Sequence, residues 1–386
     1  MTEKLYYKDS HLYSFTARVL DCREEKKGFA LVLDRTAFFP EGGGQKADSG
    51  FVGPARIAEV HEKNGEILHY ADRSLPVGEE FACELDWELR LRRMQNHSGE
   101  HIFSGFTHQL HGLDNVGFHM GEEGMTLDFS GELSWEQLTE IEQLANEAVR
   151  QNLPILTSFP EGEQLRKLEY RSKLELTENV RMVEIPGVDR CACCAPHVNH
   201  TGEVGLVKLL DCQRHRGGVR VSLICGMDAL DHIRQLQQNV TEISRQLSAR
   251  RLETAAAVER VLAEQQRLKE KVAAVSMELA VFRAAALPET EGNLCLFDSV
   301  LDEPALREVV NLLTDKCGGY AAAFSGNDAE GYRYIIGSRH LDLRAVGKAI
   351  NAGIGGKGGG SREMIQGRAS AKAAEILEFV RNNTFI

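Results

Sequence analysis

The chain has 386 residues, of which 42% are hydrophobic and 26% are charged, and its formal net charge is −12. This length favours two to four domains, this composition favours a soluble globular protein, and the negative charge argues against phosphate binding over the whole surface. No apolar run approaches the roughly 20 residues that span a bilayer, and the N-terminus has no apolar signal segment, so we expect a cytoplasmic protein without a membrane anchor.

Residues 1–90 are predicted to be all-β. Short segments of alternating apolar and polar residues are separated by Gly, Asp, Asn and Pro, which is the pattern of strands joined by tight turns. A small β-barrel is the fold that we expect for this region. The strand-like segments are 14–22, 28–35, 55–62, 65–71 and 79–87.

Residues 91–225 mix helical and strand patterns, which predicts an α/β domain. Helical periodicity covers 89–110 and 134–153, and Ser134 is a predicted N-cap of the second helix. Strand-like segments lie at 126–130, 181–185 and 219–224.

Residues 226–286 are predicted to form a helical spacer, because apolar side chains recur at alternating spacings of three and four residues. From residue 227 on, this segment contains neither Gly nor Pro. This pattern is typical of a coiled coil or a long helical hairpin, with a break near 248–257. A homodimer through this region and a helix pair packed within one chain are both compatible with it. The repeating positions are Leu230, Ile233, Leu236, Val240, Ile243 and Leu247, then Val258, Val261, Leu268, Val272, Val275, Leu279 and Phe282, with polar Gln265 in the seam.

Residues 287–386 are predicted to form a second α/β unit, so that the whole chain is an α+β multidomain protein. Its strand-like segments are 293–300, 320–326 and 332–338, and its helical segments are 304–317, 342–353 and 370–383.

Two pairs of metal-ligating residues share one spacing. His97 and His101 lie four residues apart in a predicted helix, which puts both imidazoles on one face, and Cys193 and His197 are also four apart. Three imidazoles and one thiolate suit Zn²⁺, and we expect one ion per chain. Competing ligands lie close by in the sequence: Cys191 and Cys194 for the thiolate, and His200 for the last imidazole.

Two other interpretations of these residues stay open. A zinc ion with four protein ligands can be purely structural, whereas a catalytic ion needs an open position or a ligand that moves away. Residues 97–101 also fit the inverted zinc-peptidase pattern H-x-x-E-H, in which Glu100 is the general base that activates the zinc-bound water.

Two glycine-rich segments suggest close backbone approach to a ligand. Gly42, Gly43 and Gly44 stand between strand-like segments. The second segment, 351–361, follows a predicted helix rather than a strand, which argues against dinucleotide binding. We expect a glycine nest with one lysine, which suits a phosphate or an RNA backbone. Residues 332–372 contain eight basic and two acidic residues, a local excess that suits phosphate contacts. The predicted RNA-binding residues are Gly355, Gly356, Lys357, Gly358, Gly359 and Arg362.

Taken in order, these motifs resemble the alanyl-tRNA editing proteins of the AlaX type and the editing and C-terminal parts of alanyl-tRNA synthetase. The matching segments are TAFFPEGGGQKADSG, NHSGEH, VGFHMG, CCAPHVNHTGEVG, RGGVRV and GGKGGG. The chain departs from the synthetase at Cys194, Ala195 and Pro196, where the synthetase usually has small residues.

The resemblance implies four parts: a β-barrel (1–90), a zinc-bearing editing domain (91–225), a coiled-coil spacer (226–286) and an RNA-binding DHHA1-like domain (287–386). It implies zinc ligation by His97, His101, Cys193 and His197, and hydrolysis of serine or glycine wrongly attached to tRNA for alanine. The sequence shows no class II aminoacylation core, so we expect editing without charging.

Discrimination between serine and alanine needs a partner for the serine hydroxyl, because a hydrophobic pocket separates such similar side chains by only about 10–200-fold. Thr36 and Gln45 are the predicted partners, since the glycine-rich motif lies near the amino-acid pocket in the family. The alternative is that Thr36 faces solvent and Gln45 only closes a turn. Beside the deacylase, a zinc peptidase and a non-catalytic RNA-binding protein with structural zinc remain alternatives.

Overall fold

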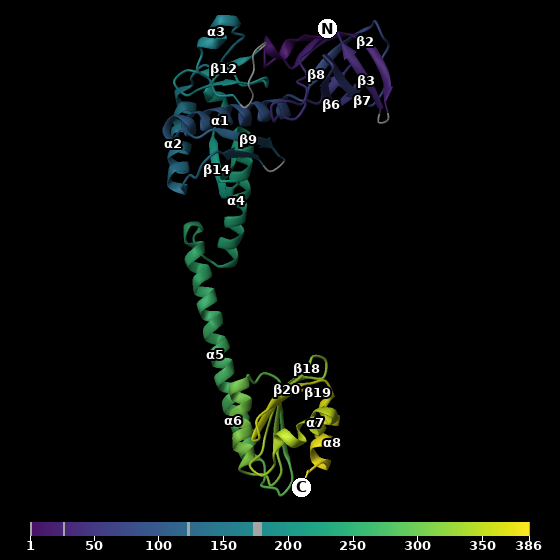
Figure 1. Cartoon of the computed structure of the whole chain (residues 1–386), viewed down its shortest axis with the longest axis vertical. Helices are drawn as coiled ribbons and strands as arrows, with labels where there is room; N and C mark the ends of the chain where they lie inside the picture. The colour runs from purple at the N-terminus through teal and green to yellow at the C-terminus, as the bar shows by residue number, and fades with distance from the viewer. Residues whose placement is uncertain (1, 26–27, 122–123, 173–179, 386) are drawn as a thin grey trace. The chain divides into compact units, whose positions relative to one another are not determined.

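The computed structural model describes residues 2–25, 28–121, 124–172 and 180–385. The chain divides into two compact units, Met1–Asn239 and Val240–Ile386, and the colour in Figure 1 follows them from purple to yellow. No described helix is long and apolar enough to cross a membrane. The finer division into four domains stays a prediction.

The first unit begins with a β-barrel, as the alternating pattern predicts. Each strand pairs with two neighbours, so the sheet has no free edge. The inward-facing positions, such as Val19, Leu31 and Ile57, are completely buried. In barrel order the strands are β2 (Ser14–Glu25), β3 (Gly28–Leu33), β7 (Glu66–Ala71), β6 (Ala55–Lys63), β5 (Gly50–Val52) and β8 (Glu80–Leu85), and the short strands β1 (Glu3–Lys4) and β4 (Arg35–Thr36) pair in parallel beside them.

Helix α1 (Trp87–His111) starts directly after the last barrel strand. The Asp86 side chain caps it by accepting a hydrogen bond from the Leu89 N–H, and Gly112, with φ of 65°, ends it. Arg90 of this helix is completely buried, forms an ion pair with buried Asp48 and donates to the Ala37 carbonyl. The ion pair fixes the barrel loop that contains Asp48 against α1.

Two sheets and a second long helix complete the first unit around α1. Helix α2 (Trp135–Gln151) starts with a capping box between Ser134 and Gln137, which confirms the predicted N-cap. A four-stranded sheet has the order β14 (Val207–His215), β15 (Gly218–Cys225), β10 (Met125–Phe129), β9 (Asn115–Met120), and a smaller one has the order β11 (Leu156–Ser158), β12 (Met182–Ile185), β13 (Asp189–Ala192).

The predicted spacer is helical, with a break where the sequence suggests one. Helix α4 (Gly226–Gln246) ends before the short helix η3 (Arg251–Glu253), and α5 (Thr254–Ala286) follows. The seam positions of α5 are exposed, whereas Ala280 and Ala284 are buried in the core beside α6.

The second unit contains a five-stranded sheet with helices on both faces. Helix α6 (Glu303–Thr314) shares one core with the sheet, and helices α7 (Leu343–Gly353) and α8 (Ala373–Asn382) share the other. The strand order is β16 (Leu294–Asp298), β17 (Ala321–Asn327), β18 (Gly331–Gly337), β20 (Met364–Ala369), β19 (Gly356–Gly360).

The expected glycine nest is wrong: Gly356–Gly360 form the edge strand β19, paired antiparallel with β20. Only Gly355 in this run has a positive φ. The glycines are needed for close approach between strands, because a Cβ on Gly358 would lie 2.2 Å from the Gln366 carbonyl oxygen and 2.5 Å from the Tyr334 hydroxyl.

Candidate metal centre

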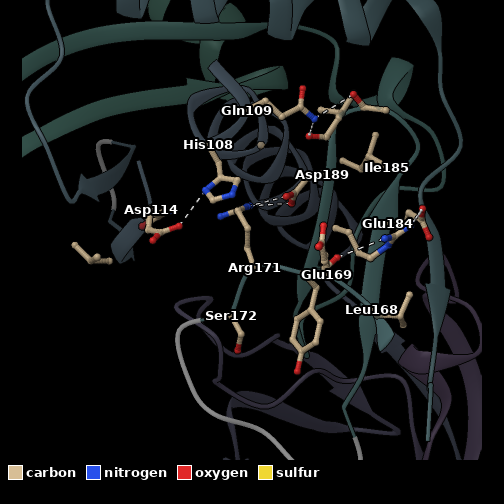
Figure 2. A pocket seen from close by; sticks show the side chains of 17 residues that line it. His108, Gln109, Asp114, Leu168, Glu169, Arg171, Ser172, Glu184, Ile185 and Asp189 are labelled. Atoms are coloured by element: carbon tan, nitrogen blue, oxygen red, sulfur yellow. Dashed lines mark hydrogen bonds and ion pairs between the residues drawn. The ribbon is translucent and has the colours of Figure 1, made fainter. Parts of the chain in front are cut away.

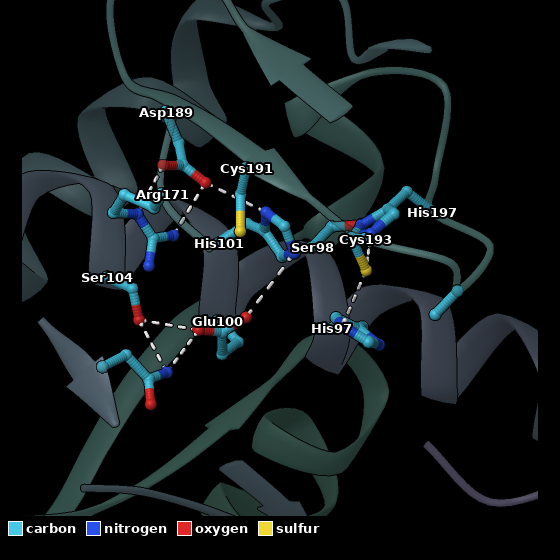
Figure 3. Close-up of polar contacts among 12 residues, drawn as sticks. His97, Ser98, Glu100, His101, Ser104, Arg171, Asp189, Cys191, Cys193 and His197 are labelled. Carbon is cyan, nitrogen blue, oxygen red and sulfur yellow. Dashed lines mark hydrogen bonds and ion pairs between the residues drawn. The ribbon is translucent and has the colours of Figure 1, made fainter. Parts of the chain in front are cut away.

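Four potential metal ligands converge on one point in the first unit (Figure 3). His97 and His101 extend from α1, while Cys193 and His197 lie in the segment after β13. Their ligand atoms all lie within 4.8 Å of one another, and each of the three imidazoles is only 2% exposed. The structure thus brings together two pairs that are almost one hundred positions apart in the sequence.

The distances suit a tetrahedral zinc site. The Sγ atom of Cys193 is 3.5 Å from Nε2 of both His97 and His197. Zinc bonds of about 2.0–2.1 Å to nitrogen and 2.3 Å to sulfur place tetrahedral ligands roughly 3.3–3.8 Å apart. The four side chains therefore fit this ion in both geometry and chemical type.

Hydrogen bonds on the far side of each imidazole direct Nε2 towards the common point. Nδ1 of His97 donates to Oε1 of Gln45 at 3.0 Å, and Nδ1 of His101 donates to Asp189 at 2.9 Å. Nδ1 of His197 lies 3.0 Å from the Ser98 hydroxyl. Such partners fix the tautomer and ring orientation of metal-binding histidines.

The electrostatics of the cluster favour a thiolate surrounded by imidazoles. Burial raises the pKa of Cys193, but the neighbouring histidines outweigh it and hold that pKa well below its usual value. Burial and the nearby His101 lower the pKa of His197 to about 3, which keeps its ring neutral. A thiolate and a neutral imidazole are the forms that bind zinc.

The competing ligands occupy other positions. Cys194 is exposed and lies against Gly42 and Gly43, and the His200 side chain is half exposed beside Glu203. Cys191 lies near His101 and Asp189.

Asp189 belongs to a supporting layer rather than to a second metal site. It already accepts two hydrogen bonds from Arg171, at 2.7 and 2.8 Å, and one from His101. Burial raises the pKa of Asp189, but these bonds and the charge of Arg171 outweigh it and lower that pKa. Its charge is thus balanced without a second ion.

Glu100 is buried beside the metal cluster. Its Oε1 accepts hydrogen bonds from the Ser104 hydroxyl at 2.7 Å and the Asn115 amide at 2.6 Å, and its Oε2 lies 3.7 Å from Nε2 of His101. The carboxylate is therefore oriented, with one oxygen close to the point on which the ligands converge.

Gln45 also lies at the cluster, at the end of a tight turn. The backbone groups of Gly42 and Gln45 bond to each other in both directions, and Gly43 and Gly44 adopt φ values of 60° and 82° that other residues rarely adopt. Gln45 is 1% exposed, and among the described residues its Nε2 has no hydrogen-bond partner. This buried amide donor is therefore available to a water molecule or to a bound ligand.

Thr36 has no described contact with the four ligands. It is completely buried, so the alternative that it faces solvent is wrong. Burial lowers the pKa of His69 to about 4, so its ring is neutral. Its Nδ1 carries the proton and donates to the Leu31 carbonyl at 3.1 Å. Nε2 of His69 is therefore an acceptor, and the Thr36 hydroxyl donates to it at 2.8 Å. The hydroxyl also accepts a bond from the Phe38 N–H.

Sequence reasoning missed several residues that support the site. Arg181 is 6% exposed, and its Nη1 donates to the carbonyls of Cys193 at 3.0 Å and Ala195 at 2.8 Å. Phe118 lies against His97, with ring centroids 5.0 Å apart, and fills the space beside Gly44. Phe118 lies in the segment VGFHMG, but no local pattern signals these contacts.

A hollow of about 930 Å³ adjoins the cluster (Figure 2). Its lining includes Asp189, which bonds to His101, and Asn115, which bonds to Glu100. Arg171 also lines it and bonds to Asp189. The hollow therefore reaches the layer of residues that supports the metal ligands.

The predicted RNA-binding residues lie in the second unit, on and beside β19. Lys357 pairs with Arg368 of β20, and Arg368 pairs with Arg333 of β18, so three exposed basic residues stand in a row on one sheet face. Among the described residues none of the three has a carboxylate within ion-pair distance. Arg362 is also exposed, in the turn between β19 and β20.

Comparison with known proteins gives a matching family. Residues 180–221 match the family described as the threonyl and alanyl tRNA synthetase second additional domain. This stretch includes Arg181, Cys193 and His197.

Similarity also extends over nearly the whole chain. The chain is 28% identical to the alanyl-tRNA editing protein AlaX-L of Pyrococcus horikoshii, over 98% of this chain and 97% of that protein. It is 29% and 30% identical to the alanine–tRNA ligases of Halorubrum lacusprofundi and Pyrobaculum neutrophilum, of which it spans 42% and 44%. The chain thus spans less than half of these ligases. The match to AlaX-L over nearly the full length of both proteins confirms the resemblance to AlaX-type editing proteins.

Proposed function

From this similarity to AlaX-type alanyl-tRNA editing proteins, we propose that the chain is a zinc-dependent hydrolase that removes serine, and also glycine, from mischarged tRNA for alanine. One observation carries the proposal: a buried Gln45 amide without a described partner stands beside four converging metal ligands. A purely structural zinc site would not need a buried donor beside it.

Bound zinc would polarise the ester carbonyl or lower the pKa of a water molecule. His97, His101, Cys193 and His197 would hold it. Because these four side chains would complete a tetrahedral site, catalysis by the ion would need one of them to move away or a fifth position to open.

The neighbouring residues then perform ester hydrolysis. Glu100, oriented by Ser104 and Asn115, accepts a proton as the water oxygen bonds to the acyl carbon. The bond between the acyl carbon and the ribose oxygen breaks, and Glu100 returns the proton to that oxygen. The Gln45 Nε2 donates a hydrogen bond to the substrate.

Gln45 and Thr36 are the proposed partners of the serine hydroxyl. Gln45 Nε2 can donate to its oxygen, because its Oε1 alone is used by His97. The Thr36 hydroxyl has a second lone pair and can accept from the serine O–H. An alanine side chain would leave the buried Gln45 Nε2 without a partner, which is the strong form of discrimination.

The basic row of the second unit is the proposed tRNA-binding surface. Like charges placed directly opposite on neighbouring strands destabilise a sheet, and an RNA backbone would relieve that cost. Arg333, Lys357 and Arg368 form this row, and Gly355, Gly356, Gly358, Gly359 and Arg362 adjoin it. A homodimer through residues 226–286 is also part of the proposal, because α5 carries an exposed apolar stripe.

The deciding experiment follows loss of the amino acid from serine-charged and alanine-charged tRNA for alanine, with the whole protein loaded with zinc. We expect faster loss from the serine-charged form. Binding of tRNA without turnover would favour the non-catalytic RNA-binding protein, and cleavage of peptides with no effect on charged tRNA would favour the peptidase.

A further inference from the structure

Two aromatic side chains of the first unit form a partly exposed patch. The rings of Tyr7 and Phe159 lie 5.7 Å apart at an angle of 64°. Tyr7 ends the short helix η1 (Leu5–Tyr7), and Phe159 lies in the loop between β11 and α3 (Gly162–Lys167). Phe159 is 50% exposed, so one face of its ring is open to stacking, and the groups around it decide what it can bind.

Arg181 connects this patch to the metal-binding segment. Its guanidinium lies 5.3 Å from the centre of the Tyr7 ring, and its Nη1 donates to the Cys193 carbonyl at 3.0 Å. The patch therefore begins one side chain away from a metal-binding residue. Lys4 also lies over the Tyr7 ring, at 5.8 Å, but its charge is paired with Glu62 at 2.9 Å.

The charge of Arg181 has no such partner, since no carboxylate of the described residues lies within ion-pair distance of it. The side chain is only 6% exposed, and its Nε is buried without a described partner. Its Nη2 also donates to no described group, but unlike Nε it is not enclosed. A mostly buried guanidinium without a counter-charge favours an anion, and phosphate and carboxylate are the anions whose geometry it matches.

A hollow of about 460 Å³ adjoins Phe159. Pro160 and Met182 add apolar surface to its lining, and Gln164 and Arg190 add hydrogen-bond donors. A nucleobase has the same combination, because it stacks through its faces and forms hydrogen bonds through its edges. The hollow therefore favours the phosphate of a nucleotide, rather than a carboxylate, as the anion that Arg181 binds.

We propose that Arg181, Tyr7 and Phe159 bind the single-stranded 3′ end of the substrate RNA, with a phosphate on Arg181 and a base stacked on Phe159. This inference rests on the proposed function, in which the 3′-terminal ribose carries the amino acid and therefore lies at the metal cluster. Outward from Cys193, the protein offers first a cation and then an aromatic ring. An RNA strand that leaves the metal cluster offers phosphates and bases in alternation, so both contacts can form together.

The stacking contact is tested by changing the protein and the RNA together. The affinity of the whole, zinc-loaded protein is measured for uncharged tRNA for alanine, either complete or without its single-stranded 3′ end. Phe159→Ala should lower the affinity for the complete RNA about tenfold and leave the affinity for the shortened RNA unchanged. Phe159→Trp keeps a stacking surface and should bind both RNAs as the wild type does. Trp135→Ala, at another aromatic position that is 50% exposed, is the matched control and should change neither affinity.

The phosphate contact is tested on the RNA, so that the bonds of Arg181 within the protein stay intact. An uncharged methylphosphonate replaces the phosphate before the terminal nucleotide. With the wild-type protein, the slope of log affinity against log salt should fall by about one. An unchanged slope would overturn the assignment of a phosphate to Arg181.

Failure of this subsite and failure of the proposed function give different results. If Phe159→Ala weakens the binding of both RNAs equally, or of neither, the subsite is overturned even when the wild type hydrolyses charged tRNA. If the complete RNA binds more tightly through Phe159 but charged tRNA is not hydrolysed, the subsite is supported and the deacylase is contradicted.

Discussion

The Gln45 side chain accepts a hydrogen bond from Nδ1 of His97 at 3.0 Å, which joins a barrel turn to the metal-binding helix. One amide thus offers two separate groups, because its oxygen orients a ligand while its nitrogen is buried without a described partner. Variants of Gln45 can separate their effects.

Gln45→Glu keeps an acceptor for His97 but removes the donor. We expect zinc content to stay near the wild-type value and deacylation of serine-charged tRNA to fall about 10–100-fold, because the serine hydroxyl loses a buried hydrogen-bond donor. Gln45→Met removes both groups and should in addition lower zinc affinity about 10–100-fold. Full activity of the glutamate variant would remove the donor from the mechanism.

His101→Ala removes one of the four converging ligands. We expect the bound zinc to fall from about one ion per chain and deacylation to be lost, because the ion loses one of its four bonds to the protein and the remaining ligands no longer fix its position. Metal analysis and single-turnover deacylation measure the two effects. His200→Ala, at a half-exposed position outside the cluster, is the matched control and should retain both. A metal-free wild-type protein with full activity would contradict the zinc mechanism.

Thr36→Val should lower the free energy of unfolding by about 1–3 kcal/mol, because Nε2 of buried His69 loses its donor. It should also slow cleavage of the serine-charged tRNA while cleavage of the alanine-charged form stays constant. Thr36→Ser keeps the hydroxyl and is the control for both effects. If the ratio of the two rates does not change, Thr36 acts only within the barrel core.

The double variant Arg333→Gln and Arg368→Gln tests the basic row. We expect weaker tRNA binding, with the slope of log affinity against log salt reduced by about one for each lost phosphate contact. Zinc content should not change, since the metal ligands belong to the other compact unit. Arg150→Gln and Arg214→Gln, two exposed positions of the first unit, serve as the control. Equal losses in both double variants would mean that only net charge matters.

Patterns among neighbouring residues were sufficient to predict much of this fold. The alternation in 14–87 predicts the barrel strands, and the spacing of His97 with His101 predicts two imidazoles on one helix face. The cap at Ser134 and the break between α4 and α5 also follow from neighbouring residues. These features depend on contacts within a few positions of the chain.

Features that depend on distant contacts were missed or misassigned. Nothing near Asp189 or Arg181 in the sequence signals that one orients His101 and the other holds the Cys193 carbonyl. The glycines of β19 were misassigned for the same reason, since the close neighbours that require Gly358 are the Gln366 carbonyl of β20 and the Tyr334 hydroxyl of β18.

The buried ion pair of Arg90 and Asp48 makes the barrel and the metal-binding helix mutually dependent. If the barrel and the helix separated, each would carry an unpaired charge in an apolar surface. Removing one partner of a buried ion pair costs about 3–5 kcal/mol. We therefore expect the first unit to melt in a single transition that releases the metal. The barrel thus forms part of the wall of the metal site. A fragment that starts at α1 would lack Gln45, and Arg90 in the first turn of α1 would have no ion-pair partner.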